Sequence, residues 1–94
     1  MDLVDVTTIR ILDGFEVEFT FSDGFVRRID LDPYIRGPIF QPLRDDPAFF
    51  RTAFVDPEGG VISWSNGADI DTQVLRYGLR PASWDLVDRP VPPG

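Results

Sequence analysis

The segment "FEVEFTF" at residues 15–21 alternates strictly between apolar and polar side chains. A period of two places alternate residues on opposite faces of an extended chain, so this segment is typical of a strand with one buried face. A strand cannot bury that face alone, because it needs neighbouring strands and a covering layer. The first third of the chain must therefore form a sheet with one wet side.

A second strand-like segment, "FVRRIDL", follows the alternating one across Ser22-Asp23-Gly24. A three-residue loop with its glycine left-handed at the third position pairs Phe21 with Phe25 and keeps the apolar residues on one face. The same loop places Glu18 beside Arg28 on the wet face. We therefore expect a hairpin with this register.

A third segment, "VDVTTIRIL", precedes the alternating one across Leu12-Asp13-Gly14. The same loop rule applied to this turn pairs Ile11 with Phe15. The apolar phase of the segment slips in the middle, and an extra residue near Thr7-Thr8, a β-bulge, explains the slip.

The segment "DPYIRGPIFQPLRDD" carries three prolines and a glycine, which exclude a long helix or a central strand. We expect an ordered loop that folds over the edge of the sheet. The following "DPAFFRTAF" predicts one or two helical turns, with Asp46 as the cap and Pro47 at the first helical position.

The segment "VDPEGGVISW" predicts a later hairpin that reverses at residues 57–60. The pair Asn66-Gly67 supplies positive φ angles for a tight turn. The closing "DTQVLRYG" predicts a short helix, which Asp71 caps and Gly78 ends.

These segments together predict an α+β fold: an antiparallel sheet built from a three-strand meander and a later hairpin, with two short helices. We expect residues 1–80 to form a single domain, since the chain has only 94 residues. Residues 81–94 are rich in proline, and we expect a mobile tail in which Trp84 is the residue that could dock.

The charge balance is acidic: sixteen acids, mostly aspartate, face nine arginines, for a net charge of −7. Such a surface repels phosphate backbones and favours encounter with a basic protein, although acids also serve as turn and cap residues. No signal-peptide pattern and no long apolar run occurs in the sequence, so we expect a cytoplasmic location and no membrane contact.

The chain has no cysteine, histidine or lysine. The thiolate nucleophile, the usual general base at neutral pH and the Schiff-base amine are therefore excluded from this chain. Carboxylates, hydroxyls, arginines and backbone amides remain. We expect no cofactor and no enzyme activity.

The segment "WSNGADIDTQVLRYG" at residues 64–78 is the most distinctive one. Asp71 stands where a helix cap is needed, and Asp69 is left without such a role. Paired with Asp71, and with Asp56 or Glu58 from the neighbouring hairpin, it could form a carboxylate cluster for a hard cation. The spacing lacks the ligand ladder of a calcium loop, so capping and turn formation are the favoured interpretation.

Trp64 also has two interpretations. An aromatic residue at the end of a short strand packs on the core with its N–H on a carbonyl, and this interpretation is favoured. Tryptophan also dominates interaction hot spots. As candidate partner-binding residues we take Trp64, Asn66, Asp69 and Asp71, together with Phe40 in the "GPIF" segment.

Several separate motifs, "FSDGF", "GPIFQPLRDD" and "VISWSNGADI", resemble the bacterial family catalogued as domain of unknown function 2442. The resemblance runs from about residue 17 to residue 75 and departs at Thr72, where such proteins often carry proline. It implies a small α+β domain that accompanies another small protein, in an arrangement similar to a toxin–antitoxin pair. Some relatives carry a helix-turn-helix after this domain, a motif that residues 79–94 do not show.

Three hypotheses on function follow. The leading one is a non-catalytic protein-interaction module, antitoxin-like, that binds a small and basic partner protein, which a neighbouring gene could encode. The alternatives are a transcriptional regulator that binds nucleic acid, which the acidity disfavours, and a carboxylate-dependent metal-binding hydrolase. A second copy of the chain could also pair with an exposed strand edge.

Overall fold

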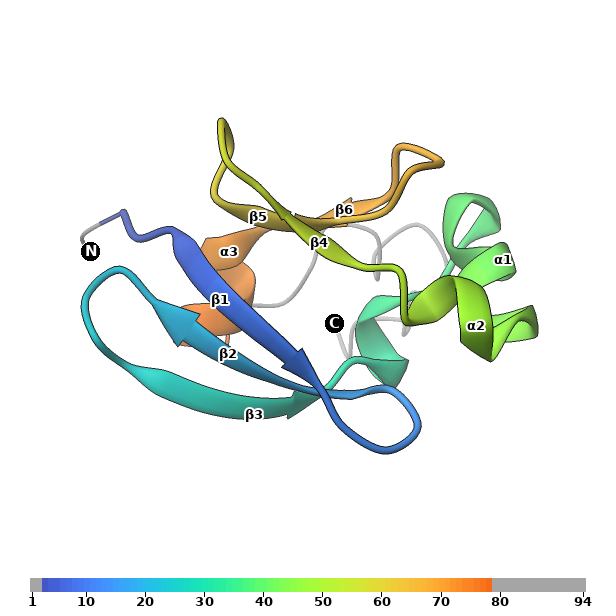
Figure 1. Cartoon of the computed structure of the whole chain (residues 1–94), viewed down its shortest axis with the longest axis horizontal. Helices are drawn as coiled ribbons and strands as arrows, with labels where there is room; N and C mark the ends of the chain where they lie inside the picture. Colours follow the sequence, from blue (N-terminus) through green and yellow to red (C-terminus); the bar gives the residue numbers. More distant parts are fainter. Residues whose placement is uncertain (1–2, 79–94) are drawn as a thin grey trace, which may run out of the picture.

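The alternating segment forms β2 (Glu16–Phe21), the central strand of a three-stranded antiparallel sheet with the order β1-β2-β3. The computed structural model describes residues 3–78 and has an α+β fold, as the sequence predicts (Figure 1). The flanking strands are β1 (Val6–Ile11) and β3 (Val26–Asp30). Residues 81–94, with Trp84, lie outside the described residues.

The second hairpin has the predicted register. The backbone N–H of Phe21 donates to Phe25 at 2.9 Å, Glu18 lies opposite Arg28, and Gly24 has a φ of 85°. Glu18 also forms ion pairs along the wet face, at 3.1 Å with Arg28 and 3.5 Å with Arg10.

The first hairpin differs from the prediction, because Ile11 lies opposite Val17 rather than Phe15. The turn closes with the N–H of Glu16 donating to Asp13 at 3.0 Å, and Gly14 is the second residue of that turn rather than the third of a loop. The predicted and observed registers differ by two residues. A shift of two keeps every side chain on its face, so the alternation alone cannot choose between them. The bulge is confirmed, since the register shifts between Val6 and Thr8.

A second antiparallel sheet has the order β4-β5-β6 and is built from β4 (Phe54–Asp56), β5 (Val61–Ser63) and β6 (Asp69–Ile70). The hairpin reversing at residues 57–60 is confirmed, whereas the third strand is too short for a sequence pattern to indicate. The turn before it repeats the loop at Gly24: the N–H of Trp64 donates to Ala68, and Gly67 has a φ of 90°. Only the glycine of the Asn-Gly pair takes a positive φ.

Two helices were expected, and both begin at their predicted caps. Asp46 accepts from the N–H of Ala48 at 3.0 Å at the start of α2 (Pro47–Phe50), and Asp71 accepts from Gln73 at 2.8 Å at the start of α3 (Thr72–Tyr77). Gly78 ends α3 with a φ of 70°.

The middle segment is more regular than the loop that its prolines suggest. It contains two 3-10 helices, η1 (Asp32–Tyr34) and η2 (Pro38–Phe40), and a third α-helix, α1 (Gln41–Asp45). A proline stands in the first turn of each of these helices and of α2, where its missing N–H has no helical partner to lose. Prolines four or five residues apart therefore divide the segment into single turns.

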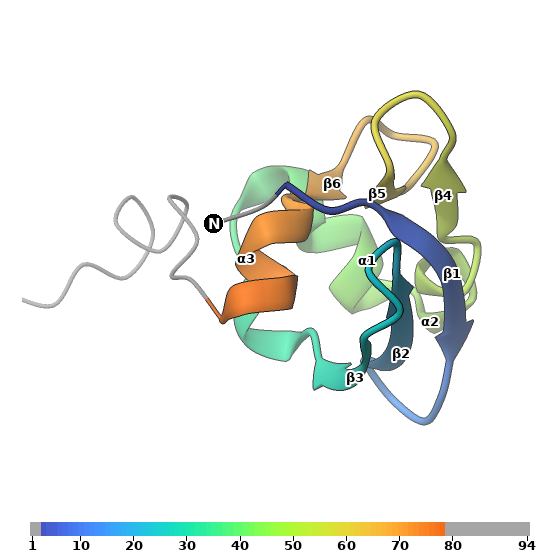
Figure 2. The same ribbon diagram turned by 90° about the vertical axis from the view of Figure 1, so that its left-hand side faces the viewer.

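The core lies between the first sheet, the second sheet and the helices. Figure 2 shows α3 across from the β1-β2-β3 sheet, with the second sheet along the top. The alternation of β2 fills this space as predicted, because Val17, Phe19 and Phe21 are buried. The other large buried side chains come from every part of the described chain: Leu31, Ile35, Leu43, Phe50, Ile62, Trp64 and Leu75. No helix within residues 3–78 has the length and apolar character to cross a membrane.

Gly60 joins the two sheets and α3 at one carbonyl oxygen. That oxygen accepts a hydrogen bond from the N–H of Val6 at 2.8 Å and one from the buried hydroxyl of Thr72 at 2.7 Å. Gly60 has a φ of 63°, and a Cβ at this position would lie 2.5 Å from the side chain of Asp5. The joint therefore requires glycine on two independent grounds.

We expect Gly60→Ala to lower the free energy of unfolding by about 2–4 kcal/mol, from the strained backbone and the clash together. Urea unfolding followed by tryptophan fluorescence measures the loss. Gly14→Ala is the matched control, because Gly14 also has a positive φ, but a Cβ added there would meet no atom within 4 Å. Equal losses in the two variants would contradict the role of the close approach to Asp5.

Candidate functional site

Trp64 lies in the core, with only 2% of its surface exposed. Its indole N–H donates to the carbonyl of Phe50 at 2.9 Å, and the two rings pack with centroids 5.8 Å apart. The favoured interpretation from the sequence is confirmed. The buried ring offers no exposed face to a partner, and a partner-binding role for Trp64 stays a prediction.

Phe40 is buried as well, at 8% exposure, so its ring also belongs to the core rather than to a contact surface. The exposed apolar residue of the "GPIF" segment is Ile39, because the 3-10 turn directs consecutive side chains to different sides. Two apolar neighbours in a sequence do not reveal which one the turn buries.

Asn66 is exposed and joins two segments that the sequence separates widely. Its side-chain N–H donates to the carbonyl of Ile39 at 3.0 Å, and its side-chain oxygen accepts from the N–H of Ala68 at 3.1 Å. The structure thus brings the "SNG" turn and the "GPIF" segment together, and Asn66 holds the turn to η2.

Asp69 and Asp71 are both exposed. Asp71 caps α3, and Asp69 pairs with Ser63 across the second sheet through the backbone. Within residues 3–78, no group of three or more acids is arranged to hold a metal ion, so these two aspartates do not converge with Asp56 or Glu58.

An open concavity of about 440 Å³ lies at the end of the first sheet where β1 turns into β2, and no residue of the segment 64–71 lines it. It runs between the β1-β2 turn and the end of β3, and its lining residues are Asp13, Gly14, Phe15, Glu16, Asp30 and Asp32. Four of the six are acids. The sequence motifs do not reveal this group, because the acids come from two segments that only the strand register brings together.

The register explains how these acids meet. Glu16 lies directly opposite Asp30 on the wet face, an arrangement of like charges that destabilises a sheet. Asp32 has a counter-ion, since Arg44 approaches it at 2.8 Å and lies over the ring of Phe15. Extending the predicted pairing of Glu18 with Arg28 by two residues would have indicated the contact between Glu16 and Asp30.

A second polar cluster holds α3 to the β2-β3 turn. The guanidinium of Arg76 forms an ion pair with Asp23 at 2.9 Å and lies 3.9 Å from the centre of the Phe25 ring. Its hydrogen bond to Asp23, with help from the N–H of Phe25, holds the pKa of that carboxyl below its ordinary value of 3.8.

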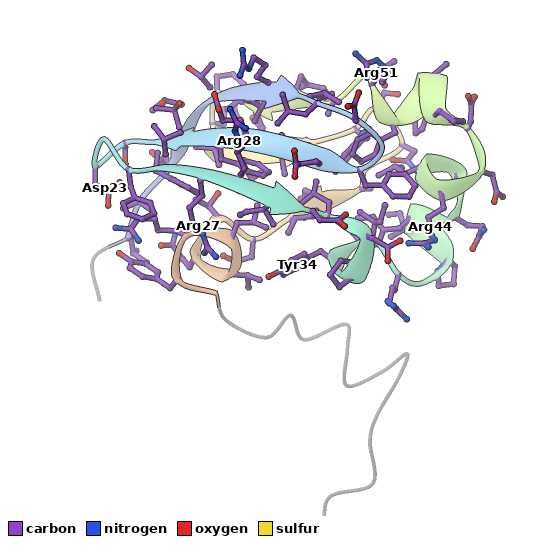
Figure 3. All side chains as sticks on the ribbon, turned by 90° about the horizontal axis from the view of Figure 1, so that it is seen from below. Asp23, Arg27, Arg28, Tyr34, Arg44 and Arg51 are labelled. Atoms are coloured by element: carbon purple, nitrogen blue, oxygen red, sulfur yellow. The ribbon has the colours of Figure 1, made fainter. Side chains whose placement is uncertain are left out.

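Arg27 belongs to the same corner but comes from the inner face of β3. It donates to the carbonyl of Leu75 at 2.6 Å and to that of Arg76 at 3.3 Å, so its positive charge lies at the negative end of α3. Figure 3 shows Arg27 and Arg28 directed to opposite sides of β3, as the alternation predicts. The two arginines therefore do not form a basic stripe.

The geometry first defines a class of protein: a small two-sheet α+β domain whose acidic side chains cap turns and helices and line one open concavity. The chain belongs to the family described as protein of unknown function (DUF2442), whose model matches residues 6–81. No curated protein matches the chain. No solved structure matches it either.

Asp23→Asn tests the ion pair with Arg76, because asparagine keeps the oxygen that accepts from Phe25 and removes the charge. The pKa of Asp23 is lower in the folded than in the unfolded state, so its charged carboxylate stabilises the fold at pH values above the unfolded-state pKa. This stabilisation is lost as the pH falls through the folded-state pKa. We expect the variant to melt about 1–3 °C lower near neutral pH, since the pair is partly exposed. The difference from the parent should close as the pH falls below about 4.

Melting curves measured by circular dichroism across this pH range check the prediction. Glu58→Gln is the control, because Glu58 is exposed and forms no ion pair within residues 3–78. A difference between Asp23→Asn and the parent that stays constant with pH would contradict the role of the charge.

Proposed function

We propose that this chain is a non-catalytic protein-interaction module that binds a small basic partner protein in the manner of an antitoxin. The observation that carries the proposal is the acidic concavity, where Asp13, Glu16 and Asp30 have no arginine as an ion-pair partner within residues 3–78. A cationic surface would relieve their mutual repulsion.

The overall charge of −7 supports the same choice of partner. It speeds encounter with a basic protein and opposes contact with a phosphate backbone. The exposed Asp69 and Asp71 extend the proposal to a second acidic segment. We place the protein in the cytoplasm, with a partner encoded by a neighbouring gene.

Co-expression with the product of each flanking gene tests the proposal. We expect one of the two products to co-purify with the tagged chain at low salt. The complex should dissociate as the ionic strength rises, because screening weakens contacts between exposed charges. An antitoxin role further predicts that the neighbour slows growth when expressed alone and that co-expression of this chain restores it.

If the tagged chain purifies without either neighbouring gene product when both are co-expressed with it, the proposal is contradicted. A salt-sensitive mobility shift with the DNA upstream of its own gene would favour the nucleic-acid alternative instead. A melting temperature raised by magnesium, manganese or calcium, and no longer raised in Asp69→Asn, would favour the metal-dependent alternative.

A further inference from the structure

The outer edge of β3 is open. Among the strands in residues 3–78, β3 pairs with β2 alone (Figure 3). The N–H of Phe21 donates to Phe25 and that of Leu31 donates to Phe15, so the odd-numbered residues of β3 direct their backbone groups toward β2. Residues alternate in an antiparallel ladder, and the N–H and C=O groups of the even-numbered residues therefore point outward.

These outward groups belong to Val26, Arg28 and Asp30. Within residues 3–78, no hydrogen bond occupies them. An edge of this kind is a template for one more strand, because an extended backbone offers donors and acceptors at the same spacing.

The two ends of this edge have different chemistry. At its start, Phe25 and Val26 are 44% and 54% exposed, and Arg76 packs against the Phe25 ring. At its end, the edge runs into the acidic concavity beside Asp30 and Glu16. A segment that lies along the edge would meet an apolar surface first and a cluster of negative charges last.

We infer that the outer edge of β3 is the docking surface for an extended segment of the basic partner, which joins the sheet as a fourth strand and places an arginine or lysine in the acidic concavity. The inference rests on the proposed function and adds to it the surface and the mode of binding. Backbone hydrogen bonds supply affinity, and the charges at the end of the edge select a basic segment.

Charge decides between this occupant and a second copy of the chain. A symmetric pairing of two β3 edges about Arg28 places two Arg28 side chains directly opposite each other, and both chains carry a charge of −7. A basic segment avoids the repulsion between two acidic chains, and its contact with Glu16 and Asp30 offsets any like-charge contact that it makes with Arg28. It also compensates the like-charge pair of Glu16 and Asp30, with which no arginine within residues 3–78 forms an ion pair.

The probe is an octapeptide of alternating arginine and valine, added to the ¹⁵N-labelled full chain and followed by NMR. We expect hydrogen exchange to slow at the amides of Val26, Arg28 and Asp30, because an added strand covers their outward N–H groups. A control octapeptide of alternating arginine and proline has equal charge but lacks half of its backbone donors, and we expect it to bind about tenfold more weakly.

A pair of double variants separates the surface from the overall charge. Glu16→Gln with Asp30→Asn removes the like-charge pair, so we expect a higher melting temperature together with about tenfold weaker peptide binding. Glu58→Gln with Asp45→Asn removes the same charge from exposed positions that do not line the concavity, and we expect binding close to that of the parent. Greater stability with weaker binding is a combination that damage to the fold would not produce.

Three results would overturn the inference: no binding of the arginine-valine peptide, equal binding of the proline peptide, or a larger loss in the Glu58/Asp45 variant than in the Glu16/Asp30 variant. Slowed exchange at the same amides with rising concentration of the chain alone would assign the edge to a second copy and also overturn it. None of these results bears on co-purification with a neighbour, so the proposed function can stand or fall separately.

Discussion

The carbonyl of Gly60 determines how the two sheets and α3 come together. It receives the N–H that begins β1 and the hydroxyl that begins α3, and the amide of Gln73 adds two hydrogen bonds to the backbone of Val4. Three of these four hydrogen bonds hold the start of β1 or Val4 just before it. These contacts hold the start of β1, whereas no backbone hydrogen bond within residues 3–78 occupies the outer edge of β3, the strand on the other side of β2.

Local rules predicted the fold where one residue decides a feature: the caps Asp46 and Asp71, the left-handed Gly24, and the buried face of β2. They failed where two solutions satisfy the same pattern. A two-residue shift in the first hairpin preserves both faces, and β6 is too short to have a period. The choice between such solutions depends on packing against distant segments, which alternation does not encode.

The candidate site was less predictable, for the same reason. Trp64 and Phe40 are aromatic residues beside turns. They are buried because they pack against distant parts of the core, such as Phe50 against Trp64, and this packing is not visible in the sequence. The acidic concavity combines residues 13–16 with residues 30–32, and each acid alone is typical of a turn. Its one sequence signal is the register of the second hairpin, which places Glu16 opposite Asp30 once Glu18 is paired with Arg28.

Two neighbouring positions of the same ladder show why that pair differs from its surroundings. Glu18 lies between Arg10 and Arg28 and contacts both, so its charge is compensated within the sheet. Glu16 lies two residues earlier on the same face, where the register supplies a second acid instead of an arginine. A single substitution at either position would remove the repulsion, and stability by itself would favour it. The proposed binding role needs both charges at the end of the outer edge of β3, and it would account for a cost that the fold does not require.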